Sequence, residues 1–353
     1  MNITCIPNVN YFDSPQFLST ALHVITILST PLYIFGIFII LTKTPIQMSS
    51  VKWYLVNVHT WIILFDYFLG FLTIPFVLIP LFVGHPLGIL RHFGLSTLDQ
   101  TIVGFAIFGC KFKSKKLIYK FSSVMITSII VLFENRFHQV CMFRTKHYWT
   151  MCRKKWICVH YITVIVMLIP FKYLCPDQRP ALQRTFQKLP CLPDYIYQAP
   201  LLVLAEDFAY HLGAIIFYLV ICGIEVFSIM IYIGYNIMKQ VKALTMSPKT
   251  YQMQKHFFIA LIIQLAIPIF MLILPAVSAL IVIIIDYYNQ AFTNFYVIIF
   301  TCHGSVSTFV MLIAHRPYRD AIKIMFRKRG VESVEVSRRG LYARRSGMFM
   351  SNG

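Results

Sequence analysis

Long apolar runs recur along the whole chain, and they limit its possible folds more strictly than any other feature of the sequence. They cover residues 17–41, 54–83, 156–170, 208–233, 257–285 and 291–314. A helix needs about 20 consecutive apolar residues to cross the hydrocarbon core of a bilayer, and most of these runs are longer than that. We therefore predict an all-α membrane protein.

The composition agrees with a lipid environment. Hydrophobic residues make up 58% of the chain and charged residues only 13%, and the mean hydropathy is +0.69, whereas soluble proteins carry about 25% charged residues. The net charge of +19 could suggest a nucleic acid partner, but the basic residues lie between the apolar runs and form no recognisable nucleic-acid motif. We expect no nucleic acid partner and interpret these residues as determinants of orientation and of contact with the lipid bilayer.

The distribution of Lys and Arg among the loops predicts the topology. Counted over alternate loops, the two sides of the membrane differ by about four to one if the chain crosses seven times. With six or eight crossings, the basic cluster at 153–155 would fall on the other side. The positive-inside rule then predicts an extracellular N-terminus (1–16), a seven-transmembrane helix bundle (17–315) and a basic cytoplasmic tail (316–353), with the N-terminus outside and the C-terminus inside.

The third span is interrupted. Residues 101–110 and 122–133 are apolar, but the block 111–121 between them contains five Lys and no acidic residue. Five Lys inside hydrocarbon would cost about 2.5–3.5 kcal/mol each, so this block cannot lie in a straight span. One hypothesis is an insertion, such as a misplaced exon boundary, since the two halves joined directly would form a span of ordinary length. The alternative is that residues 122–133 cross a locally thinned bilayer while the Lys block stays outside.

No catalytic signature is present: the sequence has no Gly-rich phosphate loop, no metal-spaced His/Glu pair on a helix and no nucleophile elbow. We therefore expect no enzyme, no metal and no cofactor. Cys175 and Cys191 lie in one predicted outer loop and are the simplest disulfide pair, with Cys5 bonded to either as an alternative and free thiols as another. Asn2 begins a glycosylation sequon.

Charged and polar residues at the cytoplasmic end of the third span and within other spans are candidate functional groups. Glu134-Asn135-Arg136 lies at the predicted cytoplasmic end of the third span. Glu134 could bind Arg136 in the resting state and release it to face a partner protein, or the two could form an ordinary interfacial pair. Asp66 and Glu225 lie within spans, where acids are costly and usually face the bundle interior. They are candidates for ligand contact or a polar network, against a local structural role. His59 and His303 also lie on apolar runs, where a hydrogen-bonded packing residue is the simpler interpretation.

The segment 318–329 is predicted to be an amphipathic helix on the inner leaflet, because Tyr318, Ile322, Met325 and Phe326 fall near one helical face. A solvated basic tail is the alternative.

The chain resembles the nematode serpentine receptor class H chemoreceptors, a branch of the seven-transmembrane G-protein-coupled receptors. Four stretches carry this resemblance. They are Leu22-His23 with Pro31 and Phe35-Gly36; Lys43-Thr44-Pro45 through Met48 and Val51-Lys52-Trp53-Tyr54-Leu55 to His59; Phe133-Glu134-Asn135-Arg136; and His303-Gly304 through Ser307-Thr308 to His315-Arg316-Pro317-Tyr318-Arg319.

The resemblance implies a multi-pass receptor of the plasma membrane, located in sensory-neuron cilia, that serves olfaction. It implies a small environmental ligand in the bundle and signal transduction through a heterotrimeric G protein. Glu134 and Arg136 resemble the family's acidic–Arg switch, and Pro317-Tyr318-Arg319 resembles its closing motif. The Lys-rich block departs from the family's continuous third span.

A ligand-gated channel or transporter is the alternative function. Seven-span chemosensory channels with the opposite orientation exist, but the charge distribution argues against that orientation here. The spans also lack the paired broken segments of inverted repeats. Accessibility of the N-terminus would separate the two functions.

Overall fold

The computed structural model describes residues 10–109, 125–140, 146–189, 192–207, 209–243 and 247–327. Its elements, in chain order, are η1 (Tyr11–Asp13), α1 (Pro15–Lys43), η2 (Ile46–Met48), α2 (Ser49–Tyr67), η3 (Phe68–Thr73), β1 (Pro75–Leu78), β2 (Phe82–Pro86), η4 (Ile89–Phe93), α3 (Thr97–Gly109), α4 (Met125–Val140), α5 (Lys146–Tyr173), α6 (Gln178–Lys188), α7 (Asp194–Tyr197), β3 (Leu202–Ala205), α8 (Ala209–Lys242), α9 (Pro248–Pro268), η6 (Ile269–Ile273), α10 (Leu274–Ile284) and α11 (Gln290–Ala314). Residues 316–327 form a further helix, which we call the terminal helix.

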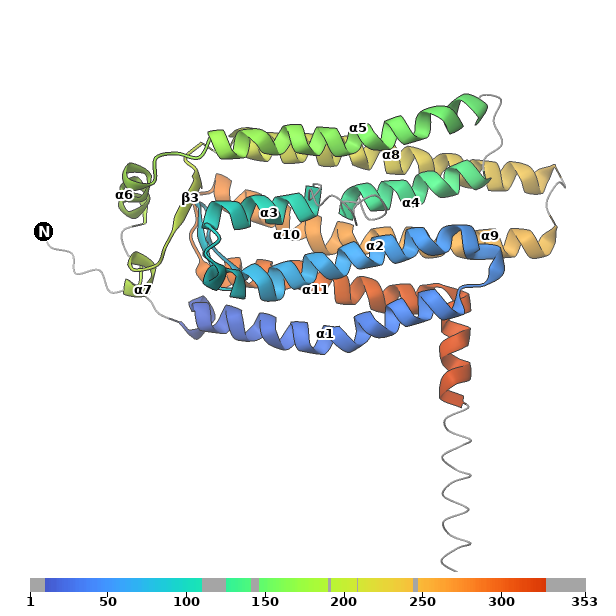
Figure 1. The fold of residues 1–353 in the computed structure, drawn as a ribbon, viewed down its shortest axis with the longest axis horizontal. Coiled ribbons are helices and arrows are strands. Elements are labelled where there is room, and N and C mark those ends of the chain that lie inside the picture. Colours follow the sequence, from blue (N-terminus) through green and yellow to red (C-terminus); the bar gives the residue numbers. More distant parts are fainter. Residues whose placement is uncertain are drawn as a thin grey trace, which may run out of the picture.

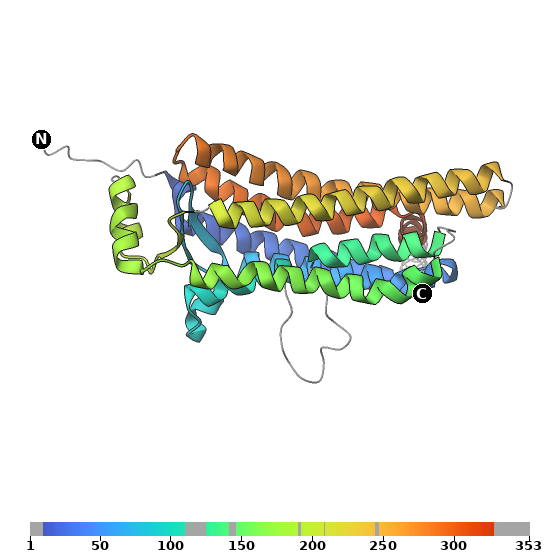
Figure 2. The same cartoon turned by 90° about the horizontal axis from the view of Figure 1, so that it is seen from above.

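The long helices run side by side and form one bundle (Figures 1 and 2). α1 packs against α2 and α11, α2 packs against α4, α4 packs against α8, and α9 packs against α11. In the part of the chain that the structure describes, six helical segments are long and apolar enough to cross a membrane. They are Pro15–Lys43, Ser49–Thr73, Lys146–Tyr173, Ala209–Lys242, Thr250–Ile284 and Gln290–Ala314.

α3 and α4 together take the place of a seventh long helix. α3 has 13 residues and α4 has 16, so neither reaches the usual length of a span. Both contact α2 and α5, and both views show them end to end along the bundle axis. The two apolar halves expected from the sequence therefore share one position in the bundle. The block 111–121 lies outside the described residues, so its origin stays a hypothesis.

The last part of the apolar run 54–83 belongs to a three-stranded antiparallel sheet that crosses one end of the bundle, so the run is not one continuous helix. The helix ends in the π-helical turn η3, Ile74 adopts a left-handed conformation with φ 45°, and Pro75 starts β1. β1 pairs with β2 from Pro75↔Pro86 to Leu78↔Val83, and β3 adds to the other edge of β2. Pro75 cannot donate the next helical hydrogen bond, and a short apolar run fits a strand as well as a helix.

The sheet is fixed to the bundle by apolar packing. Its side chains share one buried cluster with residues of α1, α6, α7 and α11. The cluster comprises Leu18, Leu22, Ile74, Phe76, Leu78, Val83, Ala181, Leu192, Ile196, Leu201, Val203 and Val297. We call this end of the molecule the sheet end. The opposite end, where α1 and α11 finish and residues 316–327 begin, is the tail end (Figure 1).

Several long helices begin with a side-chain cap. Ser14 Oγ accepts a hydrogen bond from the backbone of Phe17 at the start of α1, and Ser247 Oγ accepts one from Thr250 at the start of α9. Pro follows each Ser at the first helical position, where its missing N–H costs nothing. Asn289 caps α11 in the same way. These caps satisfy amide groups that the helix itself leaves unpaired.

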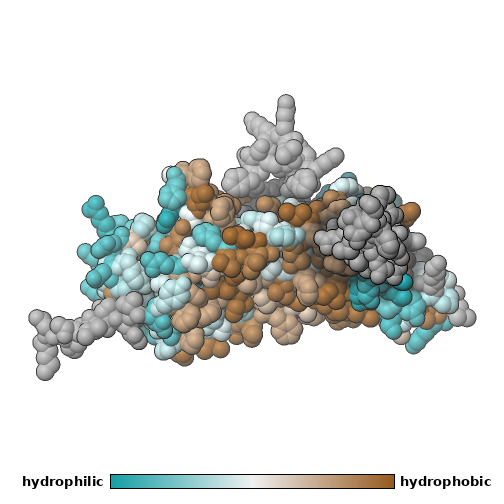
Figure 3. Space-filling model, turned by 90° about the horizontal axis from the view of Figure 1, so that it is seen from below, coloured by the Kyte–Doolittle hydropathy of each residue, from teal (hydrophilic) through white to brown (hydrophobic). Residues whose placement is uncertain are grey.

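The outer surface of the bundle is apolar around its middle. Figure 3 shows hydrophobic surface over the central part of the molecule and hydrophilic surface mainly toward the two ends. Large apolar side chains such as Ile27, Leu28, Ile231 and Phe270 are more than 60% exposed. Such a band would be unstable in water, so it is the surface that faces lipid.

The helix over 316–327 turns away from the bundle axis after His315 (Figure 1). Tyr318 is fully buried in the apolar cluster between the long helices, and Ile322 and Met325 pack against this cluster. Phe326 is instead 66% exposed. A helix extends over most of the segment predicted from the sequence, while its contact with the inner leaflet stays a prediction, as does the orientation of the whole bundle.

Candidate functional site

Glu134, the acid of the predicted switch, lies on α4 near the tail end and binds α5. Its side chain is fully buried, and Asn135 beside it is 5% exposed. Arg153 Nη2 donates to Glu134 Oε2 at 2.5 Å, and Trp149 Nε1 donates to Glu134 Oε1 at 2.9 Å. A buried carboxylate is stable only with partners of this kind. Glu134 therefore joins α4 to α5.

Arg136 binds α9 instead of Glu134. Its Nη2 donates to Gln254 Oε1 at 2.5 Å, and its guanidinium lies 4.1 Å from the ring centre of Phe257. A weaker contact joins Nη1 to Gln139 Oε1 at 3.3 Å within α4. The expectation that Glu134 holds Arg136 locally was wrong, because residues two apart on a helix do not face each other.

His315, which follows α11, connects Phe257 to the terminal helix. The ring of His315 packs against Phe257 at 5.4 Å and against Tyr318 at 5.3 Å, measured between ring centres. His315 Nε2 lies 3.2 Å from Gln264 Oε1 on α9. Arg136, Phe257, His315 and Tyr318 thus form a continuous row across α4, α9 and the terminal helix.

The predicted closing motif Pro317-Tyr318-Arg319 starts the terminal helix and anchors it. Tyr318 Oη is hydrogen-bonded to Thr44 Oγ1 at 3.0 Å, and Arg319 Nη1 donates to the carbonyl of Ile313 at 3.1 Å. The motif therefore ties the terminal helix to the ends of α1 and α11.

Asp66 lies at the centre of a buried network between α1, α2 and α11. Tyr33 Oη donates to Asp66 Oδ2, and His303 Nδ1 lies 3.1 Å from Asp66 Oδ1. Gly304 permits this approach, because a Cβ there would stand 2.1 Å from Asp66 Oδ2. Two of the four intramembrane candidates thus bind each other. His59 instead packs over Gly36, where a Cβ would lie 2.7 Å from its Nε2.

Glu225 on α8 pairs with His160 on α5. The Oε2 and Nε2 atoms are 3.1 Å apart, and the side chains are 29% and 8% exposed. The ring of His160 packs on Trp156 at 4.6 Å, and Trp156 packs on Trp149 at 5.6 Å. One face of α5 therefore connects this pair, through Trp156 and Trp149, to Glu134 near the tail end.

A cavity of about 40 Å³ lies between α2, α4, α9 and α11. It is lined by Leu55, Val58, His59, Ile62, Ile129, Leu132, Phe133, Leu261, Gln264, Leu265, Ser307 and Met311. We call it the inner cavity. Asp66 and Tyr33 line a smaller one of about 10 Å³. Of the sequence-based ligand candidates, His59 lies in the wall of the inner cavity, while Glu225 and His303 lie in neither wall.

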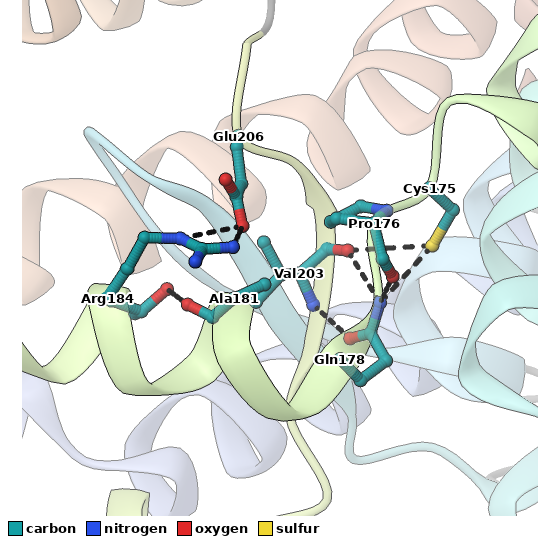
Figure 4. A network of polar contacts seen from close by, with 8 residues as sticks. Cys175, Pro176, Gln178, Ala181, Arg184, Val203 and Glu206 are labelled. Carbon is teal, nitrogen blue, oxygen red and sulfur yellow. Dashed lines mark hydrogen bonds and ion pairs between the residues drawn. The ribbon is translucent and has the colours of Figure 1, made fainter.

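At the sheet end, Gln178 holds α6 against β3 (Figure 4). Its Oε1 accepts from Val203 N at 2.9 Å, and its Nε2 donates to Val203 O at 3.1 Å and to Pro176 O at 2.8 Å. Arg184 and Glu206 form a second, exposed link at 2.5 Å. These contacts keep the connection between α5 and α8 folded over the bundle.

Cys175 carries a free thiol in this network. The thiol donates to Val203 O at 3.6 Å and accepts from Gln178 Nε2 at 3.3 Å. Burial raises the pKa of the Cys175 thiol, and the Gln178 hydrogen bond partly opposes the shift. Its predicted partners Cys191 and Cys5, like the sequon at Asn2, lie outside the described residues, so disulfide and glycosylation stay predictions. Over the described ranges, no group of three or more His, Cys, Asp or Glu could hold a metal.

Sequence reasoning missed the partners of Glu134 and Arg136. Trp149, Arg153, Trp156 and His160 follow one face of α5 at helical spacing, and that pattern was visible in the sequence. Gln254 and Phe257 gave no such signal, because their importance depends on which helix packs beside α4.

Comparisons with known proteins identify the family of this chain. A family model described as "Serpentine type 7TM GPCR chemoreceptor Srh" matches residues 13–328. The Caenorhabditis elegans protein "Serpentine receptor class H-72" is 24% identical over 330 residues, which cover 92% of this chain and 90% of that protein. The match extends over the six long helices, the α3–α4 pair and the contacts of Glu134 and Arg136 near the tail end. The chain therefore belongs to the Srh family of serpentine seven-transmembrane chemoreceptors.

Proposed function

We propose that this receptor lies in the plasma membrane of sensory cells, binds a small environmental molecule within its bundle and activates a heterotrimeric G protein through its tail end. Membership of a chemoreceptor family supports the receptor class. The observation that carries the coupling mechanism is the pair of interhelical contacts from one turn of α4. Glu134 holds α5 through Arg153, and Arg136 holds α9 through Gln254.

In this proposal the two contacts keep the tail end closed. Release of Gln254 would allow α9 to separate from α4 and would free the Arg136 guanidinium for a partner protein. Packed interfaces of this kind switch between discrete arrangements, so a small change within the bundle can be amplified at its end. A ligand promotes the open arrangement only if it binds that arrangement more tightly than the closed one.

The test uses the receptor in nanodiscs with a panel of heterotrimeric G proteins, and it measures nucleotide exchange. Arg153→Gln removes the ionic partner of buried Glu134 and leaves only its hydrogen bond from Trp149, so we expect faster basal exchange than in the unmodified receptor. Lys154→Gln removes the same charge from an adjacent exposed residue and is the matched control. Equal rates for both variants would refute the proposed coupling. An ion current without any nucleotide exchange would favour the channel function.

Localisation and orientation need a separate measurement. Tags at each terminus, stained before and after permeabilisation, should show the N-terminus outside and the C-terminus inside at the cell surface. In sensory neurons we expect the signal to concentrate in cilia. Two internal termini would contradict the seven-span topology.

A further inference from the structure

The inner cavity lies directly beside the contacts that close the tail end. Phe133 in its wall precedes Glu134 on α4, and Leu261 lies one turn from Phe257 on α9. Gln264, also in the wall, binds His315, whose ring packs on Phe257. A molecule in the inner cavity would therefore touch the two helices that Arg136 and Gln254 join.

The lining of the inner cavity selects a neutral and mainly apolar molecule. Among the described residues, its wall consists of apolar side chains except for His59, Gln264 and Ser307, and it contains no Lys, Arg, Asp or Glu. A charged molecule would lose its hydration without gaining an ionic partner there. Apolar cavities in proteins stay dry and accept small apolar molecules.

The polar groups of the wall add a preference for one oxygen atom. Gln264 uses its Oε1 to contact His315, while its amide nitrogen has no hydrogen bond to the rest of the described chain. The Ser307 hydroxyl lies in the same wall. An amide N–H and a hydroxyl can both donate to a ligand oxygen. About 40 Å³ is room for roughly three water molecules, or for a ligand with three or four heavy atoms.

We propose that the inner cavity binds a small neutral molecule with a short hydrocarbon chain and one oxygen, and that its occupancy holds α4 against α9. The ligand would contact Leu132 and Phe133 on α4 together with Leu261 and Leu265 on α9. These contacts exist only while the two helices are adjacent, so binding favours the closed arrangement. The effect on signalling rests on the proposed function, whereas binding itself does not.

Binding is tested with 1-propanol and a receptor labelled with 13C at the Met methyl groups. Met311 lines the inner cavity and is 2% exposed, whereas Met238 is 51% exposed and reports general partition into lipid. We expect a saturable shift of the Met311 resonance at millimolar 1-propanol, because so few atoms supply little binding energy. Met238 should show at most a small linear drift.

Val58→Leu adds one methylene to the wall of the inner cavity and should weaken the apparent affinity at least tenfold. Val220→Leu makes the same change on α8 at a residue that is 52% exposed, so its affinity should equal that of the unmodified receptor. A linear Met311 response, or equal affinities in both variants, would overturn the proposed site. Neither measurement requires a G protein.

Signalling is tested with the same probe. 1-Propanol should reduce basal nucleotide exchange in the unmodified receptor and in Val220→Leu, but not in Val58→Leu at the same concentration. Saturable binding with unchanged exchange would refute the proposed link between the inner cavity and closure. A receptor that never promotes exchange would refute the proposed function, and the Met311 titration would still decide whether the inner cavity binds its ligand.

Discussion

Loss of the Arg136–Gln254 contact should raise basal signalling by an amount that the structure allows us to calculate. Gln254→Ala removes the acceptor of a 2.5 Å hydrogen bond from a charged donor. Such bonds contribute about 1.5–3 kcal/mol, which corresponds to a roughly 10- to 150-fold change in an equilibrium constant. If the open arrangement is populated at about 1% in the resting receptor, it should rise to about 10–60%. The stacking of Arg136 on Phe257 remains, so we expect a result near the lower limit.

The control is Gln139→Ala, which removes another acceptor from the same guanidinium. Gln139 lies on α4 itself, 3.3 Å from Arg136 Nη1, so its loss separates no helices. Nucleotide exchange should increase about tenfold in Gln254→Ala and by less than twofold in Gln139→Ala, measured at equal receptor amounts without ligand. Spin labels on α4 and α9 should report a longer distance in the first variant only.

Two results would refute this reasoning. If both variants raised exchange equally, the acceptors would act on the orientation of Arg136 and not on the joining of two helices. If neither did so although the spin labels separated, the opening of α9 from α4 would not be the event that a G protein recognises.

Three further predictions concern stability. Gly304→Ala places a methyl group against the buried carboxylate of Asp66 and should destabilise the receptor by about 3 kcal/mol or more in a thermal unfolding assay. Gly213→Ala is the control, because no atom lies within 4 Å of the added methyl group, and it should be nearly neutral. Gln178→Ala should increase hydrogen exchange across α6 and β3, while Arg184→Ala, which breaks only an exposed ion pair, should change it little. Burial, assisted by a nearby Arg, lowers the pKa of His85 from 6.5 to about 4. The unfolded chain therefore binds more protons between pH 6.5 and 4, stability falls as the pH drops through that window, and His85→Phe should flatten the decline of the melting temperature.

Hydropathy located the membrane helices well but not their ends. The run predicted from residue 156 belongs to α5, which already begins at Lys146, and α8 continues past the predicted end at 233 to Lys242. A helix can continue beyond the hydrocarbon core, because its backbone hydrogen bonds form equally well among polar residues. Hydropathy detects only the apolar part of such a helix and therefore misses its polar ends. Hydropathy also gave one apolar run for α2 and the β1–β2 hairpin, because the residues of both are apolar.

The candidate site was predicted as a set of residues but not as a set of contacts. Sequence placed Glu134 and Arg136 at the end of a span, and the structure puts them at the tail end of α4. Their partners Arg153 and Gln254 come from two other helices. Such contacts depend on which helices are neighbours in the bundle. The arrangement of the helices is set by many weak contacts that no local sequence pattern reveals.

The attachment of the sheet to α11, described above as apolar packing, also includes a hydrogen bond that has a consequence for biosynthesis. Gln290 at the start of α11 donates to the carbonyl of Val77 in β1 at 3.0 Å, across 213 residues of sequence. At a translation rate of about 5–20 residues per second, roughly 10–40 seconds pass between the synthesis of these two partners. During that interval the β1–β2 hairpin lacks its contact with α11. A chaperone or translocon component that shields residues 75–86 would act in this period, and slow insertion of α11 would leave the receptor open to quality control.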